Sequence, residues 1–103
     1  MLVKVTADGG LSLEERDNFR AFKLVVAGQA QDIERFRHAL RGAIELADSD
    51  TAWVFEDMLH RRPEVAADGG WQQSLSAMIE KARRHGWIDD RRRAIKAHIE
   101  WSG

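Results

Sequence analysis

The stretch Ala94-Ile95-Lys96-Ala97-His98-Ile99-Glu100-Trp101 decides the fold class, because apolar and polar residues alternate strictly along it from Ile95 onward. Strict alternation predicts a strand with one face packed on a core. The apolar residues lie on the core side, and the polar residues share the other side: Lys96, His98 and Glu100. A helical alternative stays open, because some residues of this region also recur at helical spacing: Ile88, Arg92, Ile95 and Ile99.

In two longer segments before this strand, apolar residues recur with the period of a helix. Apolar residues at spacings of three and four predict one helix over residues 33–47: Ile33, Phe36, Leu40, Ile44 and Ala47. A second apolar stripe predicts a helix from Trp71 to Ala82, which basic residues and Gly86 would end. Both periods therefore occur in one short chain.

Shorter elements lie between and before these segments. Alternation and β-forming residues predict strands around residues 3–5, 22–26 and 51–55. Ser12 and Glu15 fit a capping box, which predicts a short helix over residues 13–19. Residues 56–62 predict a helical turn that Pro63 ends.

This order of elements predicts an α+β fold in a single globular domain over residues 1–103. We expect a two-layer sandwich, with a mainly antiparallel sheet of three to four strands and two long helices on one face. The ferredoxin-like arrangement is the nearest common pattern. The region between Phe55 and Gly70 departs from that pattern, because it does not read as a strand.

Composition excludes several classes of function. Sixteen basic and seventeen acidic side chains give a net charge of −1, which argues against a dedicated nucleic-acid binder. The lack of cysteine excludes disulfides, thiolate metal ligands and a thiol nucleophile. No cofactor or metal motif is present, so neither is expected. The longest apolar run near the N-terminus, Leu24–Ala27, is too short to cross a bilayer, and no signal peptide is recognisable, so we expect a cytoplasmic protein without membrane contact.

The outer face of the predicted sheet is the first candidate site. It would combine apolar and charged side chains, and an apolar surface of that kind is seldom left in water. The leading hypothesis is therefore a small binding or accessory protein that forms a homodimer through this face, with another protein as an alternative partner. The residues proposed for this interface are Trp53, Phe55, Lys96, His98 and Glu100.

A cofactor-free enzyme acting on a small organic substrate is the second hypothesis. His98 or His60 would serve as the base, because imidazole titrates near neutral pH. Trp71 or Trp87 would line the pocket, and four tryptophans without any tyrosine suggest that at least one serves an interface or pocket. An ordinary surface role for both histidines competes with this hypothesis.

The third hypothesis is a polyanion or nucleic-acid binder. Residues 81–96 hold seven basic and two acidic side chains around Trp87. Arginines beside an exposed aromatic ring can hold phosphates and stack a base. The proposed anion-binding residues are Arg83, Arg84, Arg91, Arg92 and Arg93. The helix dipole and a solvated turn explain the same residues without a ligand.

Overall fold

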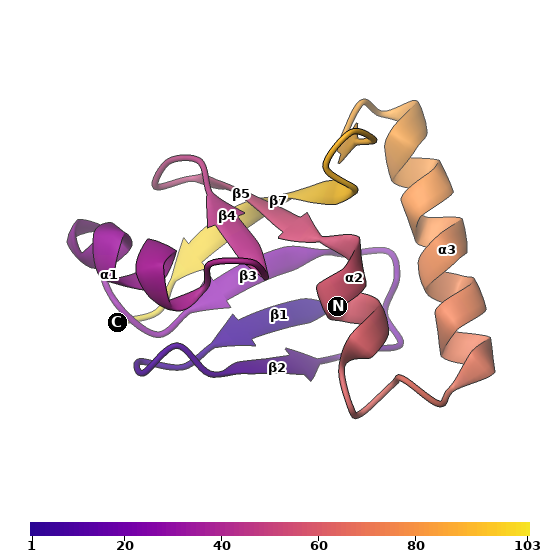
Figure 1. Cartoon of the computed structure of the whole chain (residues 1–103), viewed down its shortest axis with the longest axis horizontal. Coiled ribbons are helices and arrows are strands. Elements are labelled where there is room, and N and C mark those ends of the chain that lie inside the picture. Colours follow the sequence, from indigo (N-terminus) through magenta and orange to yellow (C-terminus); the bar gives the residue numbers. More distant parts are fainter.

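The computed structural model describes residues 1–103 and shows one mixed sheet of seven strands that curls into a half-barrel (Figure 1). The strand order is β2-β1-β3-β7-β5-β4, and β6 pairs with β7 outside this path. The strand bounds are β1 Leu2–Val5, β2 Leu11–Glu14, β3 Lys23–Val26, β4 Ile44–Leu46, β5 Thr51–Phe55, β6 Ile88–Asp89 and β7 Ala94–Trp101.

Strand β7 organises the sheet, because it pairs with three other strands. Its second half runs parallel to β3, while β5 and β6 pair with it in the antiparallel sense. β3 in turn runs parallel to β1. The alternation in β7 sets the two faces of the sheet: Ile95, Ala97 and Ile99 are buried, while Lys96 and His98 are exposed.

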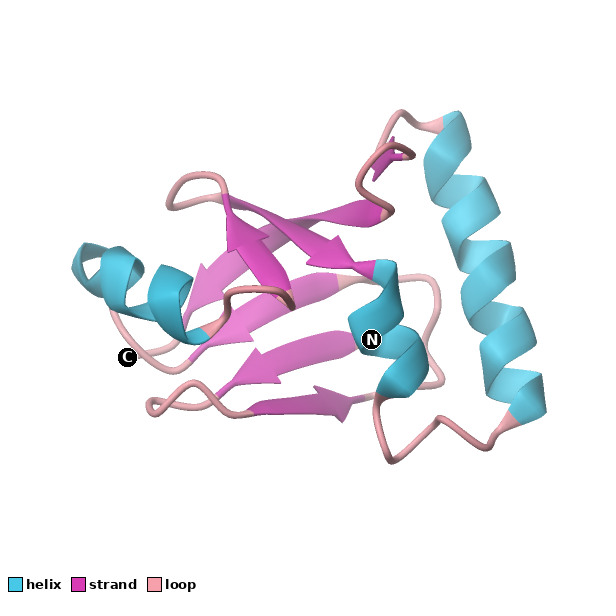
Figure 2. Ribbon diagram, in the orientation of Figure 1, coloured by secondary structure: helices cyan, strands magenta, loops and turns pink.

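Three α-helices lie against this sheet (Figure 2). Helix α1 (Ile33–Ala39), preceded by a 3₁₀ turn at Ala30–Asp32, lies at one end, and α3 (Gly69–Arg84) runs across the other end. Helix α2 (Glu56–Arg61) follows β5 directly. The Asp68 side chain accepts a 3.0 Å hydrogen bond from the Trp71 amide, which caps the start of α3.

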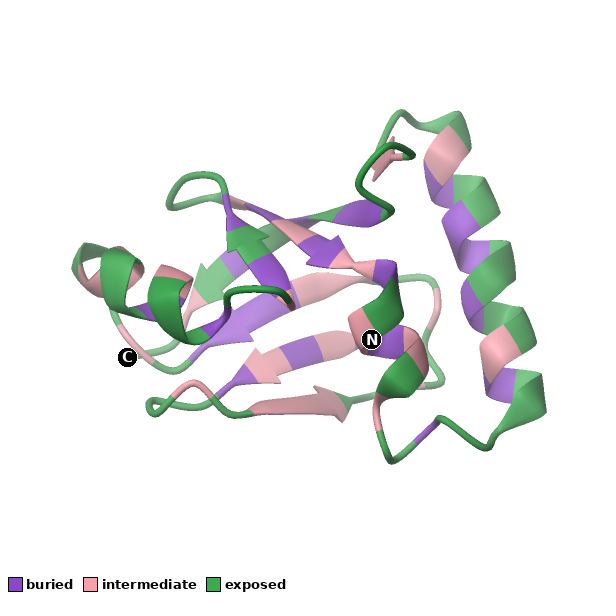
Figure 3. Ribbon diagram, in the orientation of Figure 1, coloured by how far each residue is buried: buried purple, intermediate pink, exposed green.

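A cluster of twenty buried residues forms the core inside the curl of the sheet. The strands contribute mainly valine, isoleucine and leucine, whose branched chains pack well on a pleated surface. The helices add Phe36, Leu59 and Leu75, each completely buried. Figure 3 shows the same division on α3, where buried residues follow the side that faces the sheet.

The predicted two-layer, ferredoxin-like sandwich is wrong. The sheet has seven strands rather than three or four, its centre contains two parallel pairings, and it curls instead of lying flat beneath two helices. Parallel pairing of β1, β3 and β7 joins residues far apart in the sequence. Local periodicity carries no information about such partners.

The predicted helix over 33–47 is also wrong beyond Leu40. Helix α1 ends at Ala39, Gly42 adopts a positive φ of 87°, and residues 44–46 form strand β4. Glycine takes this left-handed conformation without strain, so the chain can leave the helix there. Ile44 and Leu46 alternate around exposed Glu45, but Ile44 also fits the helical period, and that ambiguity hid the strand.

The predicted helix over 13–19 is wrong as well, because residues 11–14 form β2 and Glu15 has a φ of 47°. The strands at β1, β3, β5 and β7 are confirmed. The helices at α2 and α3 are confirmed too, and Gly86, with a φ of 78°, follows the end of α3 as predicted. The helical alternative for the last segment is therefore excluded.

Candidate ligand-binding site around Trp87

The four tryptophans differ in what their indole groups do. The indole N–H of Trp71 donates to the Arg16 carbonyl at 2.9 Å, and that of Trp101 donates to the Ser49 carbonyl at 2.8 Å. Both therefore hold loops against the core. Trp53 is half-buried beneath the Arg92 guanidinium, 5.3 Å from its ring centre. Trp87 is the exception, because 48% of it is exposed and it is the only large hydrophobic residue that is exposed.

The backbone holds Trp87 at a defined place between α3 and β7. Its amide donates to the Ala82 carbonyl at 3.1 Å, and its carbonyl accepts a 2.8 Å hydrogen bond from the Lys96 amide. On one side its ring stacks on that of His85, with ring centres 4.5 Å apart and an interplanar angle of 21°. An exposed indole fixed in this way is a preformed surface for a flat ligand.

Trp87 borders a hollow of about 260 Å³, which we call the Trp87 hollow. Its apolar wall comes from the loop before β3, from α3, from the connection that follows α3 and from β7: Phe19, Phe22, Met78, Ala82, Trp87 and Ile95. The other lining residues are all cations or histidine: Arg20, Lys81, His85 and Lys96. No acidic residue lines this hollow, so its electrostatic potential favours anions.

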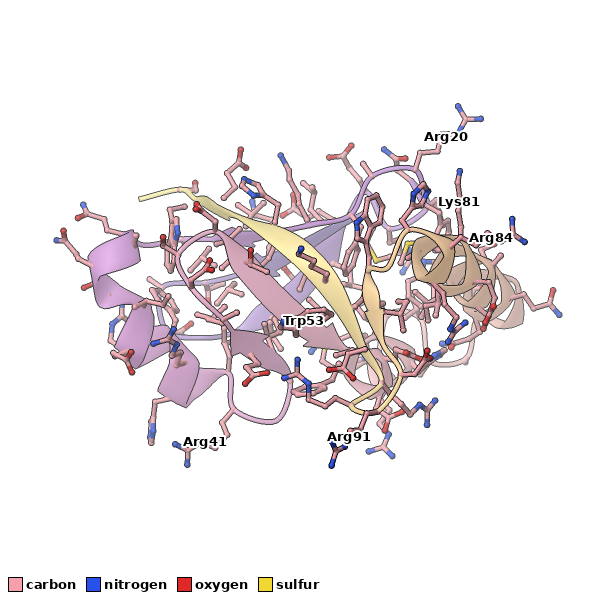
Figure 4. The ribbon with its side chains drawn as sticks, turned by 90° about the horizontal axis from the view of Figure 1, so that it is seen from above. Arg20, Arg41, Trp53, Lys81, Arg84 and Arg91 are labelled. Atoms are coloured by element: carbon pink, nitrogen blue, oxygen red, sulfur yellow. The ribbon has the colours of Figure 1, made fainter.

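The cations of the Trp87 hollow are also not neutralised by neighbours. Arg20, Lys81 and Lys96 are exposed and take part in none of the ion pairs of the chain. Figure 4 shows Arg20 and Lys81 at the same end of the molecule, close to Arg84. Their charge is therefore available to a ligand.

A second hollow of about 300 Å³ adjoins the first. The two share Phe22, Trp87 and Lys96. The remaining lining of the second hollow is more polar: Asp50, Thr51, Ala97 and His98. We call it the Asp50 hollow, because Asp50 is its only acidic residue.

The largest hollow, about 740 Å³, lies between α1 and β4 and has a different character. Charges of both signs line it, among them Glu34, Arg37 and Glu45. Arg37 is already engaged there, since it donates to the Leu46 and Ala47 carbonyls and pairs with Glu34. Its shape and charge select no ligand class, whereas the Trp87 hollow combines an apolar wall with one sign of charge.

The structure brings the residues of the predicted dimer interface together on the outer face of the sheet. Trp53 lies opposite Lys96 in the register, and His98 lies opposite Thr51. Phe55 and Glu100 follow on the same face. That face offers little free apolar surface, because Arg92 covers Trp53 and Glu100 pairs with Lys23 at 3.4 Å. Homodimerisation through it stays a prediction.

The two histidines proposed as bases lie in different surroundings. His60 contacts Gln72, whose amide also donates to the His60 and Val65 carbonyls, so His60 belongs to the connection between α2 and α3. His98 is exposed on β7 and lines the Asp50 hollow. No hydrogen bond joins His98 to a carboxylate. No group of three or more histidine and acidic side chains is placed to hold a metal ion.

The predicted cluster of arginines does not form one surface. Arg83 pairs with Asp90 at 2.7 Å and with Glu80, while Arg92 pairs with Asp89 at 2.7 Å and with Glu45. Arg93 lies 4.0 Å from Glu56. Arg84 and Arg91 remain without an ion pair, but Figure 4 shows them on different sides of the molecule. Three other cations without an ion pair, Arg20, Lys81 and Lys96, do share one hollow, that of Trp87.

Several residues of the site were not predicted from the sequence. Phe19, Arg20 and Phe22 belong to the loop before β3 and carry no motif, and Asp50 lies in a turn between β4 and β5. The signals that pointed to this place were Trp87 within a basic segment, and Lys96 and His98 on the polar side of the last strand. The contribution of the distant loop depends on the packing of α3 against it, through contacts such as Phe19 with Trp71 at 5.7 Å between ring centres.

The Arg83–Asp90 pair, which links α3 to the turn after β6, should make stability depend on pH. The hydrogen bonds from Arg83 lower the pKa of the Asp90 carboxyl, so the folded state favours the charged form. The stabilisation is present above the usual aspartate pKa of about 3.9 and is lost as pH falls through the lowered value. Asp90→Asn should lower the melting temperature near pH 7. The difference in melting temperature between this variant and the unmodified protein should become smaller at about pH 3.

Thermal unfolding followed by circular dichroism at both pH values tests this expectation. Asp17→Asn is the matched control, because Asp17 is exposed and forms no ion pair. If Asp90→Asn and the unmodified protein differ in melting temperature by the same amount at both pH values, the Arg83–Asp90 pair is not the cause of the pH dependence.

No family model, curated protein or solved structure matches this chain in the comparisons with known proteins. None of its helices combines the length and the apolar character that a bilayer span requires. The function of this protein is therefore inferred from the chemistry of the site.

Proposed function

We propose that this protein binds a small organic anion that has a flat apolar body, and that it does so in the Trp87 hollow. The observation that carries the proposal is the combination of the one exposed large hydrophobic side chain with a lining that contains cations and no carboxylate. The flat body would lie against Trp87 and Phe22, and the anionic group would face Arg20, Lys81 and Lys96. The predicted cytoplasmic location is part of the same proposal.

The size of the hollow supports a small ligand. Pockets for drug-sized ligands usually measure about 300–1,000 Å³, and the Trp87 hollow lies just below that range at about 260 Å³. Apolar burial contributes about 25 cal/mol for each Å² removed from water, so the ring should provide most of the affinity. The exposed cations would add selectivity for anions, since exposed ion pairs contribute only about 0.2–1 kcal/mol each.

A titration of the protein with 3-phenylpropionate, followed by amide chemical shifts in NMR spectra, tests the proposal. We expect saturable shifts centred on Gly86, Trp87 and Lys96, because Trp87 and Lys96 line the hollow and Gly86 lies between the lining residues His85 and Trp87. The neutral isostere 3-phenylpropanol should bind more weakly, because it lacks the charge. Equal binding of the alcohol, or shifts centred on another part of the chain, would contradict the proposal.

Paired charge variants sharpen this experiment. Lys81→Gln removes a cation of the hollow and should weaken binding of 3-phenylpropionate by about two- to fivefold. Lys4→Gln removes the same charge from β1, where Lys4 pairs with Glu14 at 3.4 Å and lines neither hollow. The affinity of Lys4→Gln should stay unchanged, so a loss in both variants would indicate a response to net charge only.

A further inference from the structure

We infer that the ligand of this site is an aromatic α-amino acid. Its ring would occupy the Trp87 hollow, its carboxylate would face Lys96, and its ammonium group would face Asp50 in the adjoining hollow. This inference rests on the proposed function and goes beyond it, because it assigns a role to a second hollow and to a carboxylate.

The two hollows are connected through shared walls. Phe22, Trp87 and Lys96 line both, so a ligand whose ring contacts Trp87 has its polar end at the border of the Asp50 hollow. Lys96 stands at that border and is exposed. A ligand that carries its carboxylate at the border can extend a second group into the Asp50 hollow.

The fold also leaves two opposite charges without partners at this place. The other charged residues on this face are neutralised: Lys23 pairs with Glu100, Lys4 with Glu14, and Arg92 with Glu45. Asp50 and Lys96 line the same hollow, yet neither takes part in an ion pair. A zwitterion satisfies both charges at once, whereas a simple anion satisfies only Lys96.

The spacing of these two charges suits a zwitterion. Thr51 lies opposite His98, so Asp50 lies beside Ile99, three residues along β7 from Lys96. Three residues of strand correspond to about 10 Å between the backbones. Both residues nevertheless line one hollow, and the flexible four-carbon stem of Lys96 lets its ammonium group approach a carboxylate whose neighbouring ammonium group faces Asp50.

Hydrogen bonds hold the backbone of Asp50 at a defined position. The Asp50 and Thr51 amides both donate to the Asp48 side chain, at 2.8 and 2.9 Å. The Asp50 carbonyl accepts a 2.8 Å hydrogen bond from the Ile99 amide of β7. Asp50 is thus tied to the strand that also carries Lys96. Its negative charge also disfavours ligands with a second anionic group, such as nucleotides or other polyanions.

The test compares phenylalanine, 3-phenylpropionate and phenethylamine with the complete chain, by isothermal titration calorimetry and amide shifts. The three probes share the ring and differ in which charged groups they carry. We expect phenylalanine to bind about fivefold more tightly than 3-phenylpropionate, which lacks the ammonium group, and phenethylamine to bind most weakly. Asp50→Asn should remove the advantage of phenylalanine and leave binding of 3-phenylpropionate unchanged or improved.

Asp57→Asn is the matched control, because Asp57 is an exposed carboxylate on α2 that lines neither hollow. It should leave the order of the three probes unchanged. If 3-phenylpropionate binds and phenylalanine binds no better, this inference is overturned while the proposed function stands. The same holds if phenylalanine keeps its advantage in Asp50→Asn. If neither acid binds at Trp87, the proposed function itself fails.

Discussion

Replacing Trp87 with alanine should weaken binding of 3-phenylpropionate by about tenfold or more, with little loss of stability. Stacking on an aromatic side chain contributes about 1–3 kcal/mol, and 1.4 kcal/mol corresponds to a factor of ten in affinity. The indole is 48% exposed and its N–H donates to no protein group, so the folded state loses few contacts. Calorimetric titration and thermal unfolding of the same sample measure both effects.

Trp53→Ala is the matched control for this prediction. It also removes an indole from the same side of the sheet, but Trp53 lines neither hollow and lies under Arg92. Its affinity for 3-phenylpropionate should equal that of the unmodified protein. An unchanged affinity in Trp87→Ala, or an equal loss in both variants, would remove Trp87 from the site.

Phe36→Ala should lower the free energy of unfolding by about 3–5 kcal/mol, the largest effect on stability that we expect. Phe36 is completely buried and is the bulkiest of the fully buried side chains. Its ring lies 6.0 Å from that of Trp101, measured between centres, and it also fills the space over Gly28. A Cβ placed on Gly28 would come within 2.6 Å of the Phe36 ring, so this contact is tight. Removing the ring should leave a cavity that a short helix cannot close.

Chemical denaturation followed by circular dichroism measures this loss. Phe36→Leu should cost less, because it restores much of the volume, and Glu34→Ala on the exposed side of α1 should change stability by less than about 0.5 kcal/mol. A loss below about 1 kcal/mol for Phe36→Ala would show that α1 does not complete the core. That result would also contradict the position of α1 against the end of the sheet.

A segment was predictable from the sequence where its apolar residues recur with a period that fits either a helix or a strand, but not both. The alternation within residues 94–101 predicts β7 because the seven residues from Ile95 to Trp101 all obey it. The stripe from Trp71 to Ala82 predicts α3, because a capping aspartate and a final glycine agree with the period. The pattern of residues 33–47 does not distinguish a helix from a strand throughout. Ile44 satisfies both periods, and only the left-handed turn at Gly42 separates α1 from β4.

The candidate site was predictable only at its centre. Trp87 and Lys96 were recognisable as candidates, because an aromatic residue within a basic segment is unusual. The remaining lining was not recognisable, since Phe19, Arg20 and Asp50 come from other loops. The predicted surface of arginines was wrong because the sequence does not show which acidic residues lie beside each arginine. Arg83, Arg92 and Arg93 pair with acidic residues, and only the structure brings those partners next to them.

The sequence by itself determined strands β1, β3, β5 and β7, helices α2 and α3, the core face of β7 and the tryptophan at the centre of the candidate site. These features depend on neighbouring residues, whose period and turn chemistry act locally. Only the tertiary structure decided the parallel pairing of β1, β3 and β7, the curl of the sheet and the charges left free at the two hollows. Those features depend on contacts between segments far apart in the chain, and their energy comes from burial and pairing that no local pattern records.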